Sequence, residues 1–177
     1  MISPDRKLDG AVLGLLVLLV SSASAPLAAQ ERSRIWLGLA PLGGAARADG
    51  AEGYAVMAEI VYQTGPHYFA IRAAGAADPL GEGADEFGDF GLLYGRAAKR
   101  PWGHASVAAG LAITGVSSCH DAFSGGSCTT LGVPVTAEAA LRLASFLGVG
   151  VQGFANLNSK SIYGGLVVFF QLGALRR

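Results

Sequence analysis

A strict two-residue alternation in residues 130–143, TLGVPVTAEAALRL, is the feature that most constrains the fold of this chain. As an extended strand, this stretch puts leucine, valine and alanine on one face and every charge and hydroxyl on the other. The part TAEAALRL also contains good helix formers, with Glu138 and Arg142 four residues apart. A helix would scatter the apolar positions around its axis, so the period of two predicts a strand. Pro134 lacks a ladder donor, and we expect a β-bulge there.

Alternation of this kind recurs along the chain. Eight segments are separated by turn residues, at 33–41, 54–63, 67–77, 87–97, 103–115, 129–143, 146–156 and 161–173. None of them approaches the roughly 18 apolar residues that a transmembrane helix needs. An even number of short alternating segments is typical of transmembrane β-barrels. The predicted fold is therefore all-β, an eight-stranded antiparallel up-and-down transmembrane β-barrel that follows an N-terminal signal peptide.

The composition narrows the function classes. Charged residues make up 15% of the chain, against about 25% in soluble domains, and the formal net charge is zero. A nucleic-acid partner, which would require a basic patch, is therefore not expected. A soluble periplasmic lipid-binding barrel would show the same alternation, with its leucine-rich face packed inward and very few charges on its surface. That alternative stays open at this point.

The N-terminus has the organisation of a secretory signal peptide. A short basic region precedes the apolar run AVLGLLVLLV (11–20), and small residues follow it. Cleavage is expected after Ala29, or after Ala25. Residues 1–29 are therefore predicted to be the signal peptide, and residues 30–177 the outer-membrane β-barrel domain.

Export bears on the two cysteines, Cys119 and Cys128, which flank HDAFSGGS. A pair that closes a short polar loop in an oxidising compartment predicts a disulfide. Two free thiols with a metal or redox role are the alternative. No second cysteine pair or histidine cluster accompanies them, and GEGADEFGD (81–89) lacks the ligand spacing of a calcium loop. No metal and no cofactor are expected.

The connections between the segments predict an orientation. The first, third and fifth are long in sequence, at PLGGAARADGAEG, DPLGEGADE and the cysteine loop. Outer-membrane barrels carry long extracellular loops and short periplasmic turns. Both termini are therefore expected in the periplasm, and the disulfide in an external loop.

Charged side chains on the polar face would point into the barrel. They are Arg34, Glu59, Arg72, Asp89, Glu138 and Arg142. The interior of an eight-stranded barrel is just wide enough for side chains to fill it, and an isolated buried charge is costly. We expect at least Glu138 and Arg142, with Glu59 or Arg72, to form an ionic network that leaves no open pore. Arg34 begins its strand, so a position in water at the barrel end is its alternative.

Aromatic residues occur where interface anchors belong. Tyr54 and Tyr62 come near opposite ends of the outward face of one segment, and Trp102 lies in the turn AKRPW beside Lys99 and Arg100. Tyrosine and tryptophan are enriched at membrane–water interfaces. Ordinary turn or core packing is the alternative reading of these residues.

One pair of residues suggests an enzyme. His104 and Ser106 lie two apart on one strand face, and HAS (104–106) superficially resembles the His-x-Ser pair of the eight-stranded lipid A deacylases. Those enzymes also use a nearby glutamate, and the first acid after Asp121 here is Glu138. No catalytic residue is predicted, and a lipid A-modifying outer-membrane hydrolase remains the alternative function.

From about Ile35 to Leu175, the eight alternating segments after a signal peptide, with GGLVVFFQLGALRR as the last strand, carry a family resemblance. The chain resembles small bacterial outer-membrane β-barrel proteins of the OmpA-like or OmpX-like eight-stranded type. This resemblance implies a Gram-negative outer membrane and a non-enzymatic role in envelope integrity, adhesion or surface interaction. It implies as partners the outer-membrane lipids with lipopolysaccharide and the outer-membrane assembly machinery, and we expect a monomer.

Overall fold

The computed structural model describes residues 33–48, 51–77, 87–121, 124–160 and 162–175, with the backbone alone at 47–48, 51–52, 77, 116–121 and 124–127. All of these belong to the unit Glu31–Arg177. The predicted signal peptide lies outside the described residues and stays a prediction. In the described part, no helix is long and apolar enough to cross a membrane.

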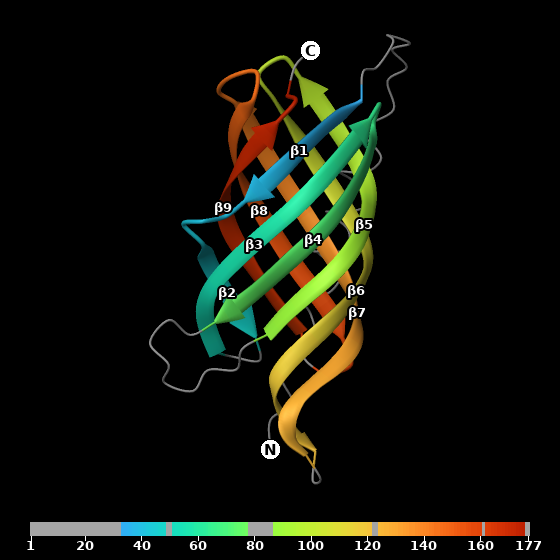
Figure 1. Cartoon of the computed structure of the whole chain (residues 1–177), viewed down its shortest axis with the longest axis vertical. Helices are drawn as coiled ribbons and strands as arrows, with labels where there is room; N and C mark the ends of the chain where they lie inside the picture. Colours follow the sequence, from blue (N-terminus) through green and yellow to red (C-terminus); the bar gives the residue numbers. More distant parts are fainter. Residues whose placement is uncertain (1–32, 49–50, 78–86, 122–123, 161, 176–177) are drawn as a thin grey trace, which may run out of the picture. The chain divides into compact units, whose positions relative to one another are not determined.

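The described residues form nine strands. They are β1 (Arg34–Leu39), β2 (Gly44–Ala48), β3 (Ala51–Thr64), β4 (His67–Ala77), β5 (Phe87–Arg100), β6 (Gly103–Asp121), β7 (Ser124–Arg142), β8 (Leu147–Asn158) and β9 (Ile162–Gly173). Each strand is antiparallel to its neighbours, and β1 and β2 both pair with β3 on one side and β9 on the other. These two therefore form one interrupted barrel strand. With β1 and β2 counted as one, the sheet closes as an antiparallel barrel of eight strand positions, which we call staves (Figure 1). The predicted fold class is confirmed.

The interruption of the first stave lies at residues 40–43. Gly43 has φ of 62°, a conformation that favours glycine, and its N–H donates to the carbonyl of Ala40. The chain then resumes pairing with Gly44 opposite Ala55 and Val167. The prediction of a long first loop was wrong, because the flanking strands β3 and β9 offer backbone hydrogen bonds that a loop would leave unpaired.

The cysteine loop is also shorter than predicted. Strands β6 and β7 run through it, and Val116 pairs with Cys128 while Cys119 pairs with Gly126. The register shifts between these two pairs.

The predicted bulge at Pro134 is wrong, because β6–β7 pairing pauses beside Pro134 and resumes in the same register. Proline has no N–H to donate, so the missing ladder bond needs no extra residue.

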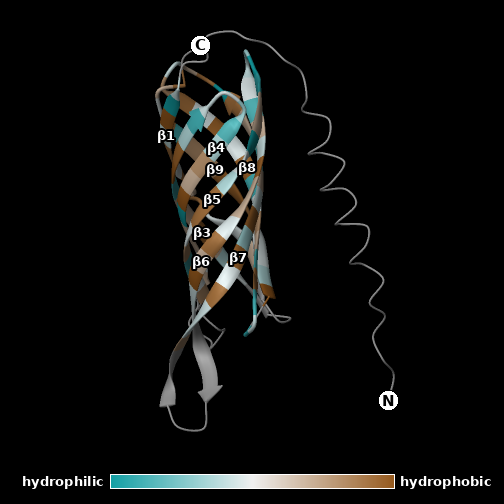
Figure 2. Ribbon diagram, turned by 90° about the vertical axis from the view of Figure 1, so that its right-hand side faces the viewer, coloured by the Kyte–Doolittle hydropathy of each residue, from teal (hydrophilic) through white to brown (hydrophobic). Residues whose placement is uncertain are grey.

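Burial alternates along the strands as the sequence predicts. In β5 (Phe87–Arg100), buried residues alternate with exposed or half-buried ones from Phe87 to Ala98. Figure 2 shows the same alternation as hydrophobic and hydrophilic bands along the ribbons. The exposed positions carry large apolar side chains, among them Leu111 at 70% and Leu131 at 75% exposure, whereas polar side chains such as Gln152 are buried inside. The soluble-barrel alternative required the reverse arrangement and is wrong.

The two ends of the barrel differ in the turns and connections that they carry. The first residue of β1, the last residue of β9 and the turns at 65–66, 101–102 and 143–146 lie at one end, which we call the terminal end. The connections at 49–50, 78–86, 122–123 and 159–161 follow strand ends at the opposite, far end.

Candidate functional site

Asp89 lies at the centre of a buried polar cluster that joins five strands. Its carboxylate accepts hydrogen bonds from Arg72 Nη2 at 3.0 and 2.9 Å, from Tyr163 Oη at 2.6 Å and from Asn156 Nδ2 at 2.9 Å. Asn156 Nδ2 also lies 3.1 Å from Thr114 Oγ1. We call these five residues the Asp89 cluster.

The Asp89 cluster is buried, and its two charges are paired with each other. The side chains of Arg72 and Asp89 form an ion pair and are both fully buried. The ring of Phe154 packs against Arg72, with 5.6 Å from the guanidinium carbon to the ring centroid. Because the donors to Asp89 come from β4, β8 and β9, one carboxylate ties opposite walls of the barrel together and helps fill its interior.

Glu59 and Glu138 belong to a second cluster. Tyr68 Oη lies 3.4 Å from both carboxylate oxygens of Glu59 and 3.4 Å from Glu138 Oε2. Gln152 Nε2 donates to Glu59 Oε2 at 3.3 Å, and His104 Nε2 lies 2.8 Å from Glu138 Oε1. We call these five residues the Glu138 cluster. In this cluster the two buried carboxylates, of Glu59 and Glu138, both lie beside the hydroxyl of Tyr68, and the imidazole of His104 lies beside Glu138.

Arg142 lies outside both clusters. Its guanidinium donates to the main-chain carbonyls of Pro101 and Leu175, and its main-chain N–H donates to the carbonyl of Trp102. The predicted Glu138–Arg142 pairing is therefore wrong. Four residues along a strand span about 13 Å, so Arg142 reaches the barrel end and holds the β5–β6 turn, while Glu138 lies deeper. Arg34 is half-buried at the start of β1, opposite Gln63.

His104 and Ser106 both face the interior. Ser106 is opposite Glu138 in the β6–β7 register, so the neighbouring strand supplies the acid that the local sequence lacks. However, the Nε2 atom of His104 faces Glu138 and Gln171, and within the described residues the buried hydroxyl of Ser106 has no hydrogen-bond partner. In this arrangement Ser106 is buried inside the barrel, and His104 contacts Glu138 and Gln171 instead of it. Among the described residues, no three His, Cys, Asp or Glu side chains converge on a metal-sized site.

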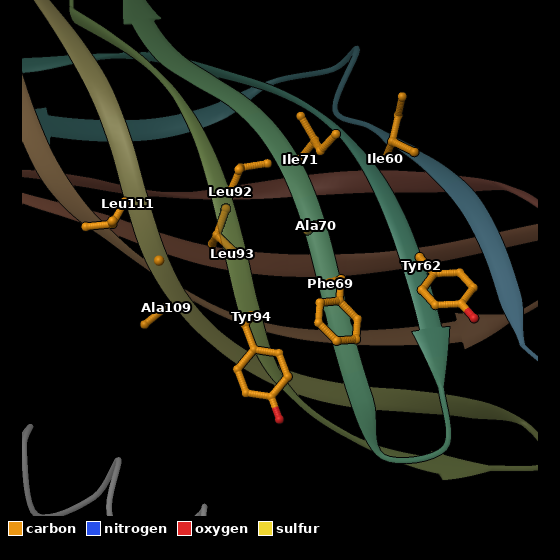
Figure 3. Close-up of a pocket in the computed structure, with 11 residues that line it drawn as sticks. Ile60, Tyr62, Phe69, Ala70, Ile71, Leu92, Leu93, Tyr94, Ala109 and Leu111 are labelled. Atoms are coloured by element: carbon orange, nitrogen blue, oxygen red, sulfur yellow. The ribbon is translucent and has the colours of Figure 1, made fainter.

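Two rows of apolar side chains cross the outer face of β3, β4, β5 and β6 (Figure 3). The aliphatic row is Ile60, Ile71, Leu92 and Leu111, which are successive partners in the strand registers. The aromatic row, nearer the terminal end, is Tyr62, Phe69 and Tyr94, with ring centroids 6.3 and 5.1 Å apart. A shallow groove of about 570 Å³ lies between the rows. Hydroxyls of the aromatic row bond Ser33 and His67, so this row is apolar on one side and polar on the other.

Further aromatic and basic residues occupy the same outer surface. Trp102 is 63% exposed at the terminal end, and Arg96 and Arg100 are exposed on the outward face of β5. Tyr54 and Tyr62 point outward from opposite ends of β3, as predicted. An aliphatic band bounded by aromatic and basic residues is the pattern that a bilayer selects in a barrel.

Comparison with known proteins bears on the fold. No family model and no curated protein matches the sequence, whereas solved structures do. The N-terminal β-barrel domain of Pseudomonas aeruginosa OprF matches with a TM-score of 0.58 and 14% identity, over 81% of this chain and 100% of that one. Neisserial surface protein A (NspA) matches with a TM-score of 0.54 and 12% identity, over 79% and 94%. This chain has the fold of the small outer-membrane β-barrels.

A third structure of this fold is Ail, the attachment invasion locus protein of Yersinia pestis, solved with the heparin analogue sucrose octasulfate. It matches this outer-membrane-type barrel with a TM-score of 0.53 and 12% identity, over 82% of this chain and 99% of that one. At such identities the likeness shows the fold alone. The interior clusters are therefore described from this barrel's own residues.

Sequence reasoning missed the neutral members of both clusters. Tyr68, Gln152, Asn156 and Tyr163 all lie on the inward face that alternation predicts, yet the predicted network counted only formal charges. Their polar atoms at inward positions were the available signal. The side chain of Cys119 lies outside the described part of the barrel, so the disulfide with Cys128 stays a prediction.

Proposed function

We propose that this chain is a non-enzymatic outer-membrane β-barrel with a structural or surface-interaction role and a filled interior that conducts no solutes. One observation carries the proposal: apolar side chains cover the outside, while the inside holds buried polar clusters. Such a surface is stable only where lipid replaces water, since soluble proteins rarely expose large contiguous apolar patches.

The filled interior supports the absence of an open pore. Each of these interior side chains is at most 5% exposed: Arg72, Asp89, Asn156, Glu59 and Gln152. An eight-stranded barrel has no width to spare around such side chains. A solute would have to break the Arg72–Asp89 ion pair to pass, and leaving either charge unpaired in the interior is expensive.

The proposed orientation in the membrane rests on where the two ends of the barrel sequence lie. An even number of staves places both ends of the barrel sequence at the terminal end, which we assign to the periplasm. Outer-membrane lipids, lipopolysaccharide and the assembly machinery are then its partners. The names of two similar barrels, a surface protein and an attachment invasion protein, support a role at the cell surface.

Membrane fractionation of cells that express the full chain tests the location. The protein is expected in the outer-membrane fraction, with faster gel migration before boiling than after it, because a closed barrel resists unfolding in detergent. Recovery in the soluble periplasmic fraction would overturn the proposal. An epitope inserted within residues 78–86 is expected to be accessible on intact cells; accessibility only after lysis would reverse the orientation.

Liposome swelling tests the filled interior. Wild-type barrel in liposomes is expected to give swelling rates equal to protein-free liposomes for small sugars, with a general porin as the positive control. Rapid swelling with the wild type would refute a filled interior. The lipid A-modifying alternative is tested separately, since it requires lipid A profiles to differ between wild type and His104→Ala.

A further inference from the structure

A second groove on the outer surface differs in chemistry from the one in Figure 3. It has a volume of about 560 Å³ and crosses the staves from β5 to β9 at the terminal end. Ala98, Ala105 and Ala139 line it as successive partners in the strand registers, and Arg100 and Trp102 lie at its terminal-end side. We call it the alanine groove.

We propose that the alanine groove binds an anionic glycerophospholipid, with an acyl chain along the alanines and the phosphate at Arg100. This inference rests on the proposed membrane location. The groove is continuous with the apolar outer surface, so a lipid chain is what fills it in a bilayer. Larger side chains, including Leu141 and Val168, also line the groove, and His104 borders it from the interior side, so a chain lying there contacts protein on more than one side.

Charge complementarity decides the headgroup. Arg100 is exposed, and a guanidinium pairs well with phosphate oxygens. The acids whose side chains the structure describes, Glu59, Asp89 and Glu138, are all buried inside the barrel and do not neutralise this surface. Trp102 beside Arg100 suits the level of lipid headgroups. The groove in Figure 3 differs, because only apolar and tyrosine side chains line it.

The mouth of the alanine groove is held in place. Arg142 bonds the carbonyl of Pro101, and its main-chain N–H donates to the carbonyl of Trp102 at 2.7 Å. The turn that carries Trp102 is therefore tied to β7, which also supplies Ala139. A fixed turn loses less conformational entropy when it binds a headgroup.

Native mass spectrometry of the full barrel released from nanodiscs tests the proposal. The nanodiscs contain equal parts of phosphatidylglycerol and phosphatidylethanolamine, and the measured quantity is the ratio of the two lipids retained on the protein. Wild type is expected to retain one phosphatidylglycerol preferentially. Arg100→Gln is expected to lower that ratio about fivefold, the effect of one basic residue near an anionic headgroup.

Matched variants locate the effect. Ala139→Phe fills the alanine groove and is expected to abolish lipid retention, whereas Ala109→Phe fills the groove of Figure 3 and should leave it unchanged. Arg96→Gln removes an exposed arginine from the same face of β5, outside the alanine groove, and should also leave retention unchanged.

Several results would overturn the proposal. Equal losses in Arg96→Gln and Arg100→Gln would show general attraction to anionic lipid, and wild-type retention in Ala139→Phe would place the lipid elsewhere. Preference for lipid A over phosphatidylglycerol in a mixed nanodisc would also refute it. A chain that does not insert at all would refute the proposed function as well, whereas insertion without lipid preference refutes the groove alone. All variants are compared by heat-dependent gel mobility, which reports a closed barrel.

Discussion

Asp89→Ala should destabilise this barrel more than any other removal of a single carboxylate, because three residues lose one acceptor at once. Arg72 would keep its charge in a fully buried position without its ion-pair partner, and Tyr163 and Asn156 would lose short hydrogen bonds. Removing one member of a buried ion pair costs about 3–5 kcal/mol. The lost hydrogen bonds of Tyr163 and Asn156 add to this cost, and the addition is limited because Asn156 keeps Thr114 as a partner. We therefore expect a total loss near the upper end of that range.

A double variant separates the cost of an orphaned charge from the cost of altered packing. Arg72→Leu with Asp89→Leu removes both charges and leaves apolar side chains in their place. Because replacing a buried pair is often nearly neutral, the double variant should be more stable than Asp89→Ala by ~2 kcal/mol or more.

Equilibrium urea unfolding in lipid vesicles, followed by tryptophan fluorescence, measures these differences. Trp36 is buried inside the barrel and reports loss of the closed state. Arg96→Ala is the control, since an exposed arginine should change the free energy of unfolding by less than about 0.5 kcal/mol. Asp89→Ala within that same margin, or a double variant as unstable as the sum of the single ones, would refute the reasoning.

Three further predictions follow from other parts of the barrel. Glu138→Ala should lower the free energy of unfolding by about 2 kcal/mol, because His104 and Tyr68 lose a buried partner; an unchanged thermal midpoint would argue strongly against the Glu138 cluster. Leu111→Arg should cost roughly 2–4 kcal/mol in vesicles, because it places a charge on the aliphatic band, and a neutral outcome in the same urea titration would contradict a lipid-facing surface. Cys128→Ser should remove the mobility difference between reduced and non-reduced gels if the predicted disulfide forms, and wild type without such a difference would disprove the bridge.

Alternation predicted the two faces well because it is local. In β7, Glu138 points inward and its neighbours Ala137 and Ala139 outward, as their spacing alone requires. Helix propensity in TAEAALRL favoured another structure, and burial of the alternating pattern overrode it. Strand limits were less predictable, since β2 and the outer part of β6 contain glycine, alanine and serine that carry little periodic signal.

The partners of the inward residues could not be read from alternation. Asp89 meets Tyr163 and Asn156 across the interior from strands more than sixty residues later in the chain. Such meetings depend on the register of every strand pair around the closed sheet, and each register is fixed by hydrogen bonds that join distant parts of the chain.

By itself, the sequence determined the alternating strands, the apolar outside and the inward position of Glu138 and Arg142, because each follows from the two-residue period of a strand. Only the tertiary structure decided what these two residues contact. Closure of the barrel brings His104 to Glu138, while Arg142, about 13 Å further along the strand, reaches the carbonyl groups of a turn. Two residues on the same inward face of one strand therefore have different roles: Glu138 is a buried acid in the interior, and Arg142 holds a turn at the barrel end. Their depths along the barrel differ, and depth is a property of the closed sheet.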